Sequence, residues 1–172
     1  MSFYVRKITF SKFPKDISSY NNNIDEVCAD AVSDLRTNSN DLSVWEIPTD
    51  SDNDIEEAVL ALVTSSKQSS FDKIDFVIFS DEALKEQGLV LSDEVGDTAV
   101  NDLKNHHKNI ANLTYGSLRS VLELITNRTI SGEQIRKTRT EIEEIIKKNL
   151  DRIDQNVFRN ERMKEKILNL SK

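Results

Sequence analysis

The sequence predicts an α/β protein with a small three- to four-stranded sheet and flanking helices, followed by a long C-terminal helical hairpin or arm. Two observations predict this fold class. In residues 1–97, short β-branched and aromatic runs alternate with amphipathic stretches. In residues 98–172, apolar residues recur mostly at steps of three and four. The first range is therefore an α/β body and the second a helical hairpin or arm, which together form one continuous structural unit.

Composition agrees with a helix-rich single core. The chain has 172 residues, of which 31% are charged, with only four Gly and two Pro. This balance favours helices over a sandwich of short strands. A chain of this length can also bury a core without disulfides or metals.

Four segments are predicted to be strands. Residues 4–10 alternate roughly as a half-buried strand does. Residues 42–47 are β-branched and aromatic, and Pro48 stops them. Residues 74–79 form a continuous apolar run, which is typical of a strand covered on both faces. Residues 89–91 are the candidate for a fourth strand.

Helices are expected between these strands. Apolar steps of three and four predict an amphipathic helix over 24–35. A second helix, over 55–65, is apolar on most sides and should be largely buried. Asp54 is its expected N-cap, with Glu57 completing a capping box. A short helix is expected over 82–87.

The C-terminal part is expected to be helical throughout. One apolar stripe covers 98–127, and Ser131 with Gln134 resembles a second capping box. A single helix over 132–170 would be about 55–60 Å long, more than the small body can cover. Such a helix must fold back on the preceding one, pair with a second copy, or lie in a partner's groove.

The distal part of this helix supplies the candidate partner-binding surface. Its apolar residues lie mostly on one stripe, and Asn149 and Asn160 near that stripe fit register-setting polar positions. The candidate partner-binding residues are Ile153, Val157, Met163, Ile167 and Leu170.

Charge is unevenly distributed. Residues 1–130 carry 22 acidic and 12 basic side chains, a net charge of −10. Residues 131–172 carry 8 acidic and 11 basic side chains, a net charge of +3. The acidic body should repel a phosphate backbone, which disfavours nucleic acid as its partner. The tail's charges alternate in sign, as on a solvated helix.

The sequence predicts a cytoplasmic protein without membrane association. Cys28 is the only cysteine, so no intramolecular disulfide can form. No apolar run approaches the roughly 20 residues that a membrane helix needs, and the N-terminus lacks a signal-peptide pattern. The abundance of Asn, Lys and Ile is typical of AT-rich bacterial or phage genomes.

No motif predicts a catalytic centre, a metal or a cofactor. Cys28 lies on the apolar stripe of the first helix, where a buried thiol is inert, although a pairing with His106 or His107 is possible. The two histidines are adjacent on a predicted helix and diverge by about 100°, so they cannot hold one metal from the same face. His107 falls on the core stripe and is expected to be buried.

Carboxylates give no complete motif either. The loop Asp50–Asp54 resembles the start of a calcium loop, but Ile55 replaces the required Gly and Ala61 the required Glu. The four glycines lie too far apart for a phosphate-binding loop. Asp75 lies inside a predicted buried strand, where it needs an ion pair or solvent at the strand edge.

The favoured function is a non-catalytic protein-binding accessory subunit, antitoxin-like, immunity-like or part of a complex, without cofactors. It would act through its acidic body, which would neutralise a basic surface, and through its amphipathic C-terminal helix. Its partner would be another protein, or a second copy, bound through that helix. The alternative is a metal-dependent hydrolase or nuclease with dispersed carboxylates, for which Asp75, Asp81 or His106 should converge. A weaker alternative is a DNA-binding regulator, with glutamates interleaved among its basic residues. That alternative would use Arg136, Lys137, Arg139, Lys147 and Lys148.

Overall fold

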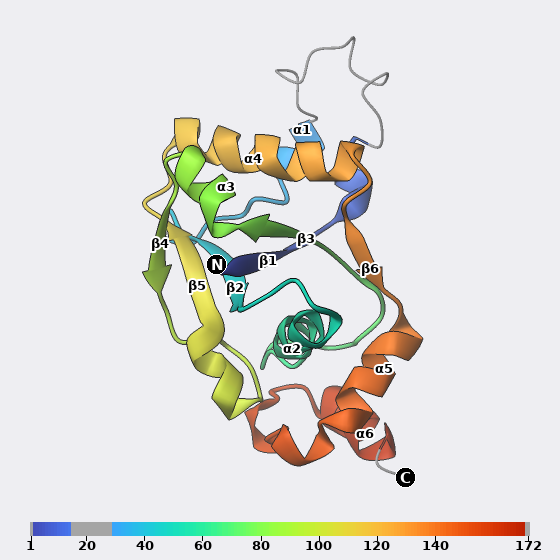
Figure 1. The fold of residues 1–172 in the computed structure, drawn as a ribbon. Helices are drawn as coiled ribbons and strands as arrows, with labels where there is room; N and C mark the ends of the chain where they lie inside the picture. The colour runs from blue at the N-terminus through green and yellow to red at the C-terminus, as the bar shows by residue number, and fades with distance from the viewer. Residues whose placement is uncertain (1, 15–28, 171–172) are drawn as a thin grey trace.

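The computed structural model describes residues 2–14 and 29–170. Within these ranges the centre of the molecule is a six-stranded antiparallel sheet with the order β4-β5-β2-β1-β3-β6 (Figure 1). The strands are β1 (Phe3–Ile8), β2 (Leu42–Ile47), β3 (Ile74–Ser80), β4 (Val90–Asp93), β5 (His107–Ala111) and β6 (Ile135–Lys137).

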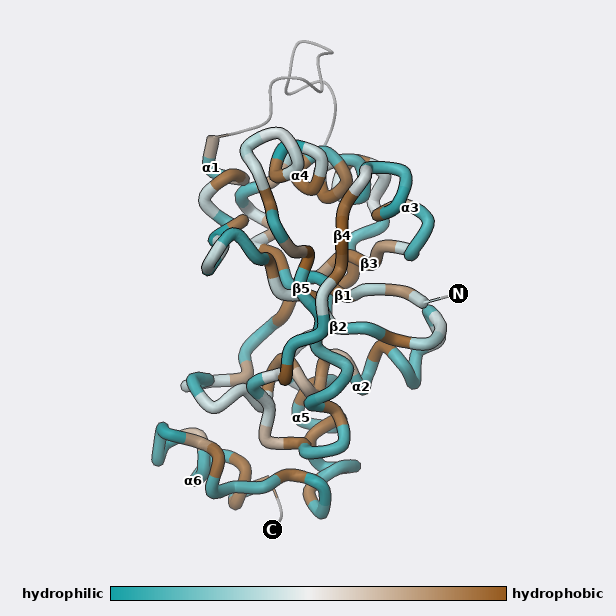
Figure 2. Tube along the Cα trace, turned by 90° about the vertical axis from the view of Figure 1, so that its left-hand side faces the viewer, coloured by the Kyte–Doolittle hydropathy of each residue, from teal (hydrophilic) through white to brown (hydrophobic). Residues whose placement is uncertain are grey.

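Helices cover both faces of this sheet. Figure 2 shows α1, α3 and α4 on one side and α2, α5 and α6 on the other. The α-helices are α1 (Ala29–Val32), α2 (Asp52–Val63), α3 (Asp81–Glu86), α4 (Tyr115–Ile130), α5 (Arg139–Lys148) and α6 (Glu161–Leu170). Short 3-10 helices are η1 (Phe10–Lys12), η3 (Asn101–His106), η4 (Leu150–Arg152) and η5 (Gln155–Val157).

Alternating residues of the central strands supply two separate cores. In β2, Trp45 belongs to the core beneath α2 and α5, whereas Val44 belongs to the core beneath α4. In β3, Phe76 and Val77 divide in the same way. Helices on both faces explain why β3 is buried along most of its length, with Asp75 as its one charged residue, and this confirms the predicted buried strand.

The predicted sheet of three to four strands is wrong, because the sheet has six. The two unpredicted strands, β5 and β6, lie after residue 98, where the sequence predicted only helix. Apolar positions in 103–110 fit a helical stripe, but the chain forms η3 and then β5. A strand of five residues is too short for its period to be distinguished from a helical one.

The segment after residue 131 is not one long helix, so the predicted hairpin or arm is also wrong. The capping box forms at Thr138 and Glu141, where α5 begins, and not at Ser131 and Gln134. Asn149 ends α5, with its Nδ2 donating to the carbonyl oxygen of Ile145 (2.9 Å). The described chain does finish in a helix, α6.

The helix expected over 24–35 lies partly outside the described residues. Its described part is α1, which has four residues and ends at Val32. Among the helices of the described ranges, none is both long and apolar enough to cross a bilayer.

Candidate functional site

An acidic cavity of about 310 Å³ lies between the end of β2, α2 and η3. Apolar side chains such as Trp45, Ala58 and Leu103 form part of its lining, and Arg152 and His106 contribute polar groups. Four carboxylates also line it, namely Glu46, Asp54, Glu57 and Asp102. We call this site the acidic cavity.

The start of α2 fixes one wall of the acidic cavity. Ser51 is the N-cap, and its hydroxyl accepts from the backbone N–H of Asp54 (3.4 Å). Asp54 Oδ2 in turn accepts from the backbone N–H (3.0 Å) and the hydroxyl (2.5 Å) of Thr49. The prediction of Asp54 as N-cap is therefore wrong by one turn. The acidic loop is part of a helix start, and Glu57 is left to face the cavity.

Arg152 joins two of the carboxylates. Its Nη1 and Nη2 donate to Glu57 Oε1 (2.8 Å) and Oε2 (2.7 Å), and Nη2 also donates to Asp102 Oδ2 (2.6 Å). The hydrogen bonds that Arg152 donates to Glu57, and after them the bond that it donates to Asp102, raise the pKa of Arg152 against the opposing effect of burial. The bidentate pair with Glu57 and the single bond to Asp102 hold both carboxylates in fixed positions.

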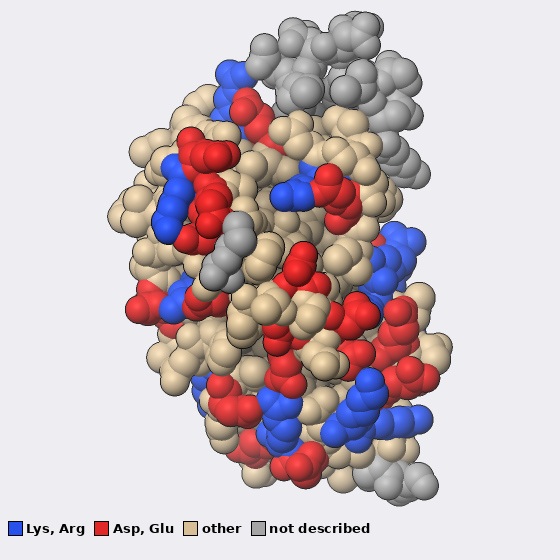
Figure 3. All heavy atoms as spheres, viewed as in Figure 1, with Lys and Arg blue, Asp and Glu red and all other residues tan. Residues whose placement is uncertain are grey.

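Asp102 is ionised at neutral pH. Burial acts to raise the pKa of Asp102, but the hydrogen bond and the charge of Arg152, with a smaller contribution from His106, outweigh it and lower that pKa. Glu46 has its own partner outside the cavity, since Lys108 Nζ lies 3.4 Å from Glu46 Oε2. With four carboxylates and one guanidinium, the lining carries excess negative charge. Acidic side chains also predominate across the middle of the face in Figure 3.

A second, polar cavity of about 310 Å³ lies against β2 and β5. It is lined by His107 and Asn109 of β5, by Glu94 and Asp97, and by the turn at residues 38–41. His107 Nδ1 lies 3.3 Å from the carbonyl oxygen of Glu94, which can only accept, so Nδ1 carries the proton. Burial lowers the pKa of His107, and the hydrogen bond and charge of Glu94 oppose this only in part.

The neutral His107 contributes mainly to packing. It is buried, and its ring meets the Trp45 ring edge-on at 5.1 Å between centroids. The backbone of Gly96 passes close to both, because a Cβ there would lie 2.5 Å from Trp45 Cη2 and 2.7 Å from His107 Cβ. The prediction of a buried His107 is confirmed, although the residue lies on a strand.

The predicted partner-binding residues pack inside their own monomer. Ile153, Met163 and Ile167 are buried in the core beneath α2, and Val157 and Leu170 are partly buried against it. Their role in binding a partner stays a prediction. Their burial leaves little apolar surface of this stripe free, so it gives the prediction no support.

The other candidates separate in space. Asp75 is paired across the sheet with Arg136, whose Nε donates to Oδ1 (2.6 Å) and whose Nη2 donates to Oδ2 (3.2 Å). Asp81 pairs with Lys85 on α3. Only His106 lies in the acidic cavity, and Cys28 lies outside the described residues. In the described ranges, no three His, Cys, Asp or Glu side chains gather as a metal site would require.

Sequence reasoning missed the acidic cavity because its walls are far apart in the chain. Arg152 and Glu57 are 95 residues apart, and no local pattern links them. The one available signal was Trp45, the only tryptophan, at the end of a strand stopped by Pro48. Comparison with protein-family models, curated proteins and solved structures found no match, so the geometry of these residues carries the functional argument.

Proposed function

We propose that this protein is a non-catalytic binding protein whose acidic body binds a basic partner protein, with a Lys or Arg side chain of the partner entering the acidic cavity. The observation that carries the proposal is the cavity lining, which combines four carboxylates with a single guanidinium and apolar side chains. Charge complementarity of this kind speeds association and selects the partner.

The lining suits a long basic side chain in two ways. The apolar wall near Trp45 and Leu103 can cover the methylene stem, while the carboxylates meet the charged head. Arg152 already holds Glu57 and Asp102 in place, so a ligand would lose little energy in ordering them. The volume of about 310 Å³ is at the small end of ligand cavities and fits one side chain better than a large cofactor.

A hydrolase is the second candidate, and one observation favours it. His106 lines the same cavity as Glu57 and Asp102. However, both carboxylates accept from Arg152, and the pKa of Asp102 is lowered, whereas a general acid needs a raised one. The geometry therefore supports binding of a cation better than proton transfer.

The basic residues after residue 131 give little support to the DNA-binding alternative. Most of its basic residues are neutralised in ion pairs with glutamates or with Asp75. The paired residues are Arg136, Lys137, Arg139 and Lys148. A phosphate backbone would have to compete with these pairs.

The test uses Trp45, the only tryptophan, as an intrinsic reporter of the acidic cavity. A lysine-rich peptide without aromatic residues is titrated into the protein, and into Asp102→Asn and Asp151→Asn variants. Asp151 is an exposed carboxylate on η4 outside the cavity, so it is the matched control for lost charge.

The proposal predicts that the peptide changes Trp45 fluorescence and that added salt weakens binding. Asp102→Asn should raise the dissociation constant by roughly two- to fivefold, the effect of one partly exposed ion pair, and Asp151→Asn by less. If a glutamate-rich peptide produces the same change, or if both variants behave alike, the acidic cavity is not the binding site.

A further inference from the structure

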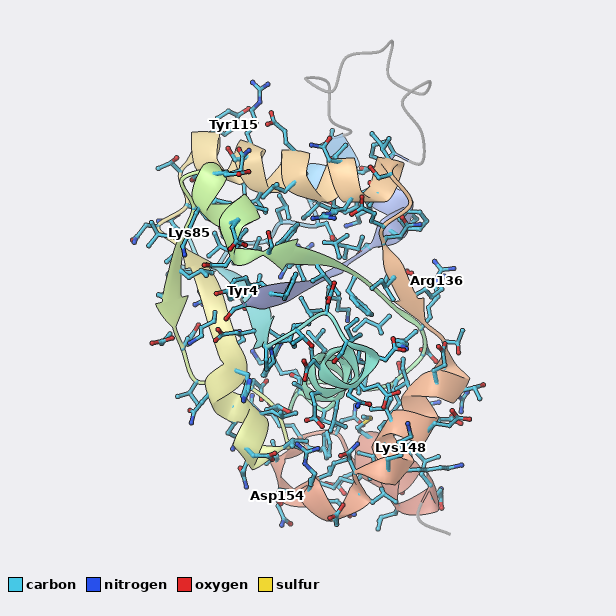
Figure 4. All side chains as sticks on the ribbon, in the orientation of Figure 1. Tyr4, Lys85, Tyr115, Arg136, Lys148 and Asp154 are labelled. Carbon is cyan, nitrogen blue, oxygen red and sulfur yellow. The ribbon has the colours of Figure 1, made fainter. Side chains whose placement is uncertain are left out.

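The two edges of the sheet differ in how they are protected. Edge strands usually carry lysines, prolines or bulges that prevent another strand from pairing with them. β6 has only three residues, two of which are Arg136 and Lys137 (Figure 4 labels the first), and α5 follows at once. β4, with the sequence Val-Leu-Ser-Asp, has neither lysine nor proline, and Asp93 is its one charged residue. Its only strand neighbour in the described ranges is β5.

Exposed apolar side chains gather near β4. Val90 is 58% exposed and Val95 is 72% exposed, and both belong to β4 or the loop after it. Tyr115 is 91% exposed at the start of α4, four residues beyond Ala111, the partner of Val90 in β5. Figure 1 places this start of α4 by the beginning of β4, where Val90 lies, and Figure 4 shows Tyr115 directed away from the sheet.

The charges around this edge are negative. The Asp93 side chain is 86% exposed, and the next residue, Glu94, is exposed as well. The cation on the neighbouring strand, Lys108, is already paired with both Asp93 and Glu46. Because one lysine is shared between two carboxylates and Glu94 adds a third, an incoming strand that carries Lys or Arg would meet net negative charge. A second copy of this acidic chain would bring charge of the same sign.

We infer that an extended, Lys- or Arg-bearing segment of the partner protein adds to β4 as a seventh strand. Its main chain pairs with the free edge of β4, a cation faces Asp93 and Glu94, and an apolar side chain covers Val90. This inference rests on the proposed function, because it takes the partner to be a basic protein, and it adds the mode of docking. With only four residues in β4, the side-chain contacts supply most of the selectivity.

Three eight-residue peptides test the docking mode. The first alternates valine with lysine, the second replaces lysine with glutamate, and the third is the first with N-methyl groups at alternate residues. N-methylation removes main-chain donors from one edge and keeps the charge, so it separates strand pairing from simple attraction. Amide chemical shifts of the isotope-labelled full chain report where each peptide binds.

The inference predicts that the valine–lysine peptide shifts the amides of Val90–Asp93, and that N-methylation weakens its binding at least tenfold. Asp93→Lys should weaken binding by roughly three- to tenfold, because it turns an attraction into a repulsion. Glu144→Lys is the matched control, since this exposed residue of α5 gives the same change in charge on another element. Its affinity should stay within twofold of the wild type.

The outcomes distinguish this inference from the proposed function. If the N-methylated peptide binds equally well and the shifts gather around Glu57 and Asp102, docking on β4 is overturned while the proposed function stands. If neither lysine peptide binds at millimolar concentration, both are overturned. If light scattering shows a dimer that Asp93→Lys dissociates, the occupant is a second copy and the basic partner is wrong. Should Asp93→Lys fail to fold, the N-methylated peptide still decides the question.

Discussion

Arg152 and Glu57 form a bidentate ion pair between segments that are 95 residues apart, with N···O distances of 2.8 and 2.7 Å. The same guanidinium reaches Asp102 on η3 (2.6 Å). One side chain of the C-terminal segment therefore fastens α2 to η3 and shapes the acidic cavity between them. The C-terminal segment is part of the core, and through Arg152 it is also part of the candidate site.

Replacing Arg152 should cost both stability and binding. Arg152→Ala leaves Glu57 and Asp102 facing each other without a cation, and we expect a loss of about 1–2 kcal/mol after allowing for solvent screening. Urea unfolding measures it. Arg139→Ala is the control, since its pair with Glu143 lies on one exposed helix face and should matter less. Equal losses in the two variants would contradict the fastening role.

Gly96 should tolerate no side chain. In Gly96→Ala, the new Cβ would lie 2.5 Å from Trp45 Cη2, and we expect a loss of about 1–3 kcal/mol from overpacking. Gly116→Ala is the matched control, because the nearest atom to its Cβ is Thr114 Oγ1 at 3.8 Å and alanine favours a helix. Thermal unfolding compares the two variants. If Gly96→Ala unfolded at the wild-type midpoint, the Gly96 backbone would not lie as close to Trp45 as described.

Stability should fall in acid through carboxylates held by hydrogen bonds. Asp97 accepts from Ser65 Oγ (2.9 Å), from Ser66 N (3.1 Å) and from Ser66 Oγ (3.0 Å). Burial alone would raise the pKa of Asp97, but these bonds outweigh it and lower that pKa below its ordinary value of 3.8. The unfolded chain therefore binds protons first as pH falls, so the stability from Asp97 is present above about pH 4 and is lost below it.

The Asp97→Asn variant checks this assignment. It cannot ionise, so its stability should depend less steeply on pH than that of the wild type below about pH 4. Urea unfolding at a series of pH values measures the difference. Superimposable pH profiles would mean that Asp97 does not contribute to the acid sensitivity.

The last helix should behave as core. Ile167 is fully buried against the α2 core, so Ile167→Ala should lose about 2–5 kcal/mol of unfolding free energy. Leu168, the next residue, is 46% exposed, and its replacement by Ala should cost far less. If the two variants were equally stable, α6 would not be part of the core.

Local patterns were enough for the strands that the chain buries on both faces. β3 reads as a strand because helices cover both of its sides, and β2 is marked by Trp45 and by Pro48 after its end. β5 and β6 were not predicted, for two different reasons. β5 has apolar spacing that also fits a helix, and β6 has only three residues, of which Arg136 looks like surface until Asp75 is known to face it.

The long C-terminal helix was over-predicted because no Gly or Pro interrupts it. Polar side chains interrupt it instead. Thr138 starts α5, Asn149 ends it, and Asp154 caps η5 by accepting from the backbone of Asn156 (3.0 Å). Such caps end a helix only where tertiary packing stabilises the interrupted conformation. The same packing brings Arg152 to Glu57, which no reading of adjacent residues could have anticipated.

The proposed function depends most on a cation entering the acidic cavity. Reversing one charge in that cavity tests it most directly. The measurement is the dissociation constant of the lysine-rich peptide for the wild type and for Asp102→Lys at low and at physiological salt. We predict that the wild type binds more tightly at low salt and that Asp102→Lys binds at least tenfold more weakly. Equal affinity of the two proteins, or binding that salt does not change, would contradict the account.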